Sequence, residues 1–420
     1  MVSACVLYLD DIELTAQKRF VPDKLSALFQ ESDRIETPDP DGGEPDVEYR
    51  ARRESVLNRL DVMGCTEALA RRRFEGWKAE QIDREEEYLS EWKAEQPDAD
   101  KTIKALQELT WDGWCQRVPD VLASLYDDDS SIDEIDQQMK SMDENSWLWF
   151  DGSDSLISLR AIIQAASDKQ DVALHVGDLI GGGWIDANAK ICAEKIRIVA
   201  ARGQPAGPAV ILAEGKSDIA ILKASIERFH PDLREFVTFL DHTEFKVDGG
   251  ASYVVKFLKA FAAARVPANI VAVFDNDAAG LTAYRQARSL RLPDNMTCIH
   301  LPDIELARAY PTIGPQGRHD ADINGRACGI ELYLGRNALS SNGALRPVRW
   351  TGYDQSSDTY QGEVDEKEAV QNAFLTAMQN GSGNIDTDYS EMQLVWATIL
   401  ETIANTAERA QEQGRSPPEL

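Results

Sequence analysis

The middle of the chain alternates short apolar runs with amphipathic stretches. Four of these runs have the length of a buried strand, and they cover residues 209–213, 236–240, 269–274 and 296–301. Between the runs, apolar residues recur every three or four positions, as on one face of a helix. Regular alternation of strand and helix predicts a four-stranded parallel sheet with helices on its faces.

The first 200 residues have a different pattern. Long charged stretches with few helix breakers, such as residues 54–96, predict a mostly α-helical N-terminal domain. Two glycines and two prolines at 203–208 predict a linker at its end. After about residue 335 the pattern is mixed and ends in an amphipathic helix, with apolar residues at Met392, Trp396, Ile399 and Ile403.

We therefore predict an α+β multidomain protein. Its expected parts are a helical domain over residues 1–204, a Rossmann-like α/β domain over 205–335 and a small C-terminal extension over 336–420. Apolar residues make up 43% of the chain, enough for sizeable cores.

Composition limits the compartment in which the protein acts and the way it could bind nucleic acid. We see no apolar run long enough to span a membrane and no secretion signal. The six cysteines form no Cys-x-x-Cys pair, which argues against a zinc site and for a cytoplasmic protein with reduced thiols. The net charge of −28 is unfavourable for general coating of nucleic acid, and it reflects solubility or carboxylates gathered around divalent cations.

Residues 215–217, Gly-Lys-Ser, invite comparison with a phosphate-binding loop. That loop needs another glycine five residues before Gly215, but the position holds Val210, inside an expected strand. The glycine-rich turn that would surround the phosphates is missing. We therefore exclude an ATPase site of this type.

Carboxylates follow two of the expected strands. Glu214 comes after the run at 209–213, and Asp275 and Asp277 come after the run at 269–274. The carboxyl ends of parallel strands meet at one edge of a sheet, where functional groups gather. Neighbouring carboxylates repel each other unless they share a proton or a cation, and Mg²⁺ prefers oxygen ligands. The pattern predicts a site for Mg²⁺ or Mn²⁺.

This combination of residues resembles the Toprim domain of primases, topoisomerases and OLD (overcoming-lysogenization-defect) nucleases. The resemblance covers roughly residues 208–335 and depends on "AEGKSD" and "FDNDAAG". It implies that Glu214 is a metal ligand or general acid/base and that Asp275 and Asp277 hold Mg²⁺. Asp218 is then either a further ligand or a helix cap.

Two more site residues come from the resemblance to OLD-type nucleases. Glu331 in "ACGIELYLG" matches a glutamate that joins the metal site, with an exposed helix carboxylate as the alternative. A lysine downstream is expected to stabilise charge on the phosphate, and Lys367 is the candidate.

The N-terminal part resembles the domain that precedes Toprim in bacterial HEPN/Toprim proteins. The segments that carry this resemblance include "LTWDGWCQRV" and "WLWFDGSDSLISLRAII". HEPN ribonucleases use an Arg-x4–6-His motif, but the first histidine is His175 and the nearest arginine before it is Arg160. The ribonuclease site is therefore missing, and we expect this domain to bind a protein partner or a second copy of the chain.

Taken together, the resemblances imply a Mg²⁺-dependent endonuclease, in antiphage defence by analogy, with DNA rather than RNA as the expected substrate. OLD nucleases carry an ATPase and this chain shows none, so a partner gates the activity or it is ungated. Two alternatives stay open: a nucleic-acid-binding module without catalysis, and primase-like nucleotidyl transfer. A primase usually brings a zinc ribbon, which is not seen here.

Overall fold

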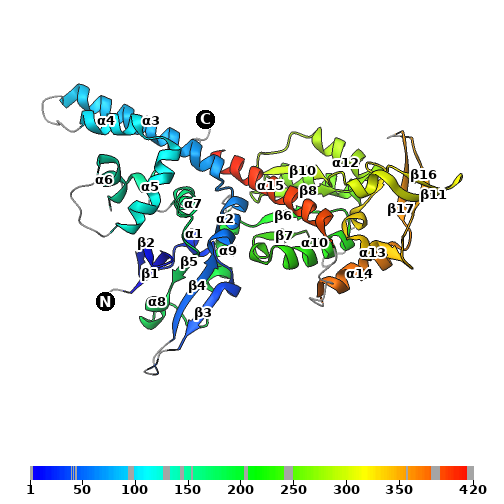
Figure 1. The fold of residues 1–420 in the computed structure, drawn as a ribbon, viewed down its shortest axis with the longest axis horizontal. Coiled ribbons are helices and arrows are strands. Elements are labelled where there is room, and N and C mark those ends of the chain that lie inside the picture. The colour runs from blue at the N-terminus through cyan, green and yellow to red at the C-terminus, as the bar shows by residue number, and fades with distance from the viewer. Residues whose placement is uncertain are drawn as a thin grey trace. The chain divides into compact units, whose positions relative to one another are not determined.

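The computed structural model divides the chain into two compact units, Met1–Arg202 and Gly203–Leu420. It describes residues 3–38, 40, 42, 45–92, 99–125, 133–141, 146–152, 155–202, 207–240, 249–355, 358–379 and 388–413. Figure 1 shows the elements of both units. The predicted boundary at 335/336 falls inside the second unit.

The first unit contains a five-stranded antiparallel sheet in the order β2-β1-β5-β4-β3. The strands are β1 (Ala4–Leu9), β2 (Ile12–Lys18), β3 (Arg34–Thr37), β4 (Asp46–Arg52) and β5 (Asp171–His175). The prediction of a mostly helical N-terminal domain missed this sheet and is wrong on that point. Its central strand β5 arrives about 120 residues after β4, so this pairing is non-local. Strand β4 does alternate apolar and polar residues, a signal that the prediction overlooked.

Helices make up the rest of the first unit. They are α1 (Asp23–Ser26), α2 (Arg53–Val62), α3 (Glu67–Trp92), α4 (Ala99–Glu108), α5 (Trp111–Ala123), α6 (Glu134–Lys140), α7 (Leu156–Ala165), α8 (Gly177–Gly181) and α9 (Ile191–Ala201). Six aromatic side chains from α3, α5 and the turn around residue 147 pack against each other: Phe74, Trp77, Trp111, Trp114, Trp147 and Phe150. This cluster accounts for much of the tryptophan in the sequence.

The second unit is built on the predicted parallel sheet. All four expected strands are present, as β6 (Ala209–Leu212), β7 (Val237–Phe239), β8 (Ile270–Phe274) and β10 (Met296–His300). They are parallel throughout and lie in the order β10-β8-β6-β7. The prediction of a four-stranded parallel sheet is confirmed. Strand β8 is completely buried, as its unbroken apolar run requires.

Helices cover both faces of this sheet (Figure 1). Helices α11 (Ala251–Ala263) and α12 (Ala278–Arg288) pack together on one face, and α10 (Lys216–Phe229) and α15 (Ser390–Gln413) lie on the other. The indole N–H of Trp396 in α15 donates to Ser225 Oγ in α10 at 2.8 Å. The last helix of the chain is therefore part of the layer that supports the sheet.

A second, smaller sheet has the order β12-β11-β16-β17. Its strands are β11 (Tyr310–Gly314), β12 (Gly317–Ala321), β16 (Val348–Asp354) and β17 (Thr359–Val364). It is followed by α14 (Lys367–Gln379), which packs on α10. Residues after 335 thus supply two strands of the smaller sheet and two helices, α14 and α15, that pack beside the parallel sheet. None of the helices that the structure describes is long and apolar enough to cross a bilayer.

Candidate functional site

The carboxylates that follow β6 and β8 meet at one edge of the parallel sheet. These two strands are neighbours, and Glu214 and Asp275 follow their carboxyl ends. Glu214 Oε1 accepts a hydrogen bond from the backbone N–H of Asp275 at 3.0 Å. The two strand ends are therefore joined by a side chain that was expected at a metal site.

Gly280 allows this close approach. It lies in the first turn of α12, and a Cβ at this position would come within 2.3 Å of the Asp275 carbonyl oxygen and 2.9 Å of Glu214 Oε1. Any other residue would push the helix away from the strand end. The last residue of "FDNDAAG" is therefore a glycine because a side chain would not fit there.

Asp218 and Asp277 each hold the start of a helix. Asp218 Oδ2 accepts from the backbone N–H of Gly215 at 2.7 Å, at the beginning of α10. Asp277 caps α12, and its Oδ1 accepts from the N–H of Gly280 at 2.7 Å. The cap considered for Asp218 is present, and the same bonds fix both carboxylates at the edge of the sheet.

Glu331 enters the site from another segment. It lies in the 3₁₀ helix Ile330–Tyr333, and its side chain is only 3% exposed, so the alternative of an exposed helix carboxylate is wrong. The N–H of Ile330 donates to Asp275 Oδ1 at 3.1 Å. A Cβ at Gly329 would lie 2.8 Å from Glu331 Oε2 and 3.5 Å from Asp275 Oδ2, so these two oxygens flank the same point.

Helix α14 supplies the polar partners of Glu331. Lys367 Nζ lies 2.9 Å from Glu331 Oε1, and Gln371 Nε2 donates to the same oxygen at 2.6 Å. The two side chains are one helical turn apart and therefore share a face. The sequence analysis did not predict Gln371. Its position four residues after Lys367 puts it on the same helix face, but this points to the site only if Lys367 is already assigned to it.

Burial and the charges of neighbouring carboxylates raise the pKa of Glu214, Asp218, Asp275 and Asp277. Burial raises the pKa of Asp275 well above its usual range, and the charges of Asp218, Glu214, Glu331 and Asp277 raise it further. Burial also raises the pKa of Glu214 to about 7. Asp275 is thus close enough to four other carboxylates for their charges to oppose its ionisation.

One ammonium group faces this negative cluster. Burial works to lower the pKa of Lys367, but the charges of Glu331, Asp275 and Asp218 outweigh it and the pKa is raised. Lys367 therefore stays protonated at neutral pH. Its side chain is 41% exposed, so the ammonium also reaches solvent.

The donor atoms suit a hard divalent cation, because all five candidates are carboxylates. As they stand, however, no three His, Cys, Asp or Glu side chains among the described residues surround a common point closely enough to hold an ion. Several oxygens are instead turned to backbone N–H groups or to Lys367. The residues fit a cation in chemistry, and closing around one requires rotation of side chains.

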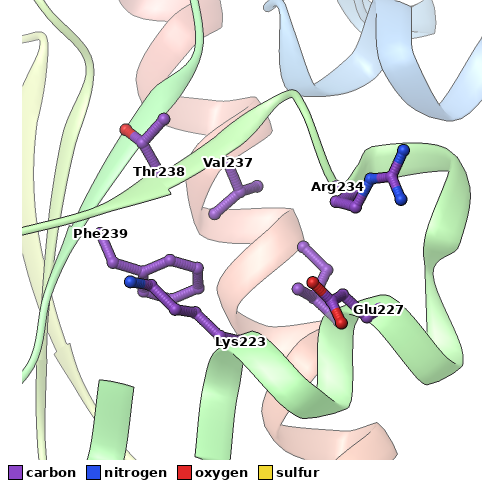
Figure 2. Close-up of a pocket in the computed structure, with 7 residues that line it drawn as sticks. Lys223, Glu227, Arg234, Val237, Thr238 and Phe239 are labelled. Carbon is purple, nitrogen blue, oxygen red and sulfur yellow. The ribbon is translucent and has the colours of Figure 1, made fainter. Parts of the chain in front are cut away.

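A separate pocket of about 360 Å³ lies at the edge strand β7 (Figure 2). Lys223, Glu227 and Arg234 supply its charges, and Lys223 Nζ lies 5.9 Å from the ring centroid of Phe239. None of the five carboxylates lines it. The pocket is therefore distinct from the carboxylate cluster.

His175 and Arg160, the arginine that precedes it in the sequence, each contact a carboxylate. His175 Nε2 lies 2.6 Å from Asp46 Oδ1, whereas Arg160 Nε pairs with Asp61 Oδ1 at 2.9 Å. The two residues have different partners on different elements. This arrangement agrees with the lack of an Arg-x4–6-His motif.

Residues 1–204 match the family model of the HEPN/Toprim N-terminal domain 1. This match supports a HEPN/Toprim-type protein. The match ends next to the division between the two units, and a domain of this family suggests a nuclease-like or nucleic-acid-related function. No curated protein and no solved structure is similar to the chain at a significant level. Identity of the second unit as a Toprim domain, and its likeness to OLD nucleases, stay predictions.

The raised pKa of Glu214 gives a prediction about stability and pH. A carboxyl whose pKa is about 7 in the folded protein, against a usual 4.5, favours folding while protonated and loses that contribution as pH rises from about 4.5 to 7. The amide of Glu214→Gln does not titrate, so the variant does not lose stability in this way, and its side-chain oxygen still accepts the N–H of Asp275. The free energy of unfolding, measured with urea in EDTA, should therefore change in favour of the variant: the difference between variant and wild type should be roughly 2–3 kcal/mol larger at pH 8 than at pH 4.5.

The matched control is Glu227→Gln, on the exposed face of the same helix α10. Its stability difference from wild type should not change over that pH range. A constant difference for Glu214→Gln as well would show that the Glu214 carboxyl is not strained in the folded protein.

Proposed function

We propose that the second unit is a nuclease site that hydrolyses nucleic acid phosphodiesters with Mg²⁺ or Mn²⁺. The observation that carries this proposal is the gathering of five carboxylates and one lysine at the carboxyl edge of a parallel sheet, with Asp218 and Glu331 buried and the other three half-buried. Ligand sites of open α/β sheets occur at this edge. Such a concentration of like charge is costly for folding and needs a compensating function.

A divalent cation would remove most of this cost. Glu214, Asp275 and Asp277 are the proposed ligands, and Asp218 and Glu331 are proposed to complete the set. A cation held by these residues would supply polarisation of the phosphodiester and activation of a water molecule for attack. The N–H groups of Asp275 and Gly280 hold one oxygen of Glu214 and one of Asp277, and the second oxygens of these two carboxylates are proposed for this role. Asp218 accepts at both oxygens, from the N–H of Gly215 and from Ser217 Oγ, so it would have to release Ser217 to bind a cation.

Lys367 is proposed to bind the substrate phosphate. Its ammonium is protonated, partly exposed and anchored to Glu331. Negative charge grows on the phosphate oxygens during hydrolysis, and a fixed cation stabilises it. Gln371 is a positioning residue in this scheme, because it holds Glu331 without reaching the substrate.

The first prediction for this function is metal-dependent cleavage. Purified protein should cleave at least one of supercoiled plasmid, single-stranded DNA and tRNA with Mg²⁺ or Mn²⁺ and not with EDTA. Asp275→Asn keeps the side-chain size and the acceptor for Ile330 N–H but removes a charge, so the rate should fall about 100-fold or more. Gel analysis of the products measures the rate.

Asp320→Asn, on the exposed strand β12, is the matched control and should cleave as wild type does. Cleavage that persists in Asp275→Asn would place the activity elsewhere in the preparation. Nucleic acid binding without cleavage under any condition would favour the binding module instead.

The second prediction concerns Gln371 and metal binding. Gln371→Leu keeps the side-chain volume but leaves Glu331 with one fewer donor, so the carboxylate is less well oriented. Removal of such an outer hydrogen bond weakens metal affinity by about 10- to 100-fold. The Mn²⁺ concentration that gives half of the maximal rise in Tm should increase accordingly.

Gln393→Leu, on the exposed face of α15, provides the control for the same substitution. It should leave the Mn²⁺ titration unchanged. Equal titrations for wild type and Gln371→Leu would exclude a role for Gln371 in orienting Glu331.

A further inference from the structure

The hairpin of β16 and β17 carries a row of aromatic side chains that the carboxylate site does not use. Tyr353 and Tyr360 face each other across the two strands, with ring centroids 5.2 Å apart, and they are 48% and 56% exposed. Trp350 continues the row, 6.3 Å from Tyr360. Exposed aromatic rings of this kind are uncommon on a surface without a binding role.

Trp350 lies flat on the sheet because both flanking strands have a glycine beside it. Gly362 in β17 is its direct partner, and a Cβ there would lie 3.2 Å from Trp350 Cε3. A Cβ at Gly314 in β11 would lie 3.0 Å from Trp350 Cδ1. The two glycines provide room for the indole to lie across three strands, next to the exposed tyrosines.

The hairpin leads directly into the carboxylate site. Strand β17 ends at Val364, and α14 begins with Lys367 three residues later. Strand β17 also packs against α12 and against β13 (Ala327–Cys328), which pairs with β9 (Asn276–Asp277). From Tyr360 to Val364 the strand covers about 13 Å, at about 3.3 Å per residue, a length that a few nucleotides can span.

Charge indicates which kind of nucleic acid suits this surface. The net charge of the chain is −28, and two arginines beside the hairpin are already paired, Arg349 with Asp365 and Arg346 with Glu366. Duplex binding depends on many lysines and arginines that neutralise phosphates. Base stacking needs no charge, but a duplex hides the faces of its bases.

We propose that Trp350, Tyr353 and Tyr360 form a stacking surface for the bases of a single-stranded nucleic acid and lead its phosphates toward Lys367. That the phosphates reach Lys367 for cleavage rests on the proposed nuclease function, whereas stacking of the bases does not. Stacking of a base on an aromatic ring tolerates any sequence, so this surface selects for strandedness and not for sequence.

The test compares two fluorescein-labelled strands of equal length, an oligothymidylate and an abasic strand with the same phosphates. Fluorescence anisotropy in Ca²⁺, used in place of Mg²⁺, measures their affinities for the full chain. Wild type should bind the oligothymidylate more tightly than the abasic strand. Tyr360→Ala should weaken binding of the oligothymidylate by about fivefold or more and leave the abasic strand unaffected.

Tyr360→Phe keeps the ring and should bind as wild type does, which separates stacking from the hydroxyl group. Tyr88→Ala removes a tyrosine of similar exposure (46%) from the first unit and should have no effect. Equal affinities of wild type for both strands, or no effect of Tyr360→Ala, would overturn the proposal, as expected if the hairpin docks a protein instead.

Cleavage assays in Mg²⁺ separate this proposal from the nuclease function. Cleavage by wild type that does not depend on Tyr360 would contradict the stacking surface and leave the nuclease intact. Tyr360-dependent binding without cleavage would support the stacking surface and contradict the nuclease.

Discussion

Repulsion among buried and half-buried carboxylates is the constraint on which the second unit depends. Asp275 is surrounded by four other carboxyl groups, and its ionisation is opposed both by burial and by their charge. The fold keeps them together through hydrogen bonds that a backbone supplies: the N–H groups of Gly215, Asp275 and Gly280 each hold one carboxylate oxygen. These bonds hold in place groups that repel each other, and the proposed cation would reduce that repulsion.

The cluster also explains why elements far apart in the sequence must pack together. Glu331 lies in the 3₁₀ helix that follows β13. Its partners Lys367 and Gln371 lie in α14. Helix α14 in turn packs on α10, whose first turn contains Asp218. The residues after 335 therefore belong to the site as much as the parallel sheet does, and a fragment that ends at residue 335 would lack the only cation paired with Glu331 in the described part of the chain.

Local patterns in the sequence predict the parallel sheet well. Its strands are short apolar runs bounded by polar residues, and their carboxyl ends place Glu214 next to Asp275 because adjacent parallel strands end at the same edge. In the first unit, β4 alternates apolar and polar residues and could have been predicted, whereas the order of the sheet could not, because β5 joins strands that lie far from it in the sequence. The β16–β17 hairpin was missed for a related reason: its glycines, such as Gly362, make room for Trp350 only once the strands are paired. Gln371 has no motif of its own and gains a role only through Glu331. The roles of the carboxylates as ligands stay predictions.

The central claim is that the five carboxylates hold a divalent cation. The most direct measurement is anomalous diffraction from crystals of the full chain grown with Mn²⁺. The account predicts an anomalous peak within coordination distance of Glu214, Asp275 and Asp277, with their side chains turned toward it. Well-ordered carboxylates that keep their hydrogen bonds to Gly215, Asp275 and Gly280, with no peak between them at millimolar Mn²⁺, would contradict it.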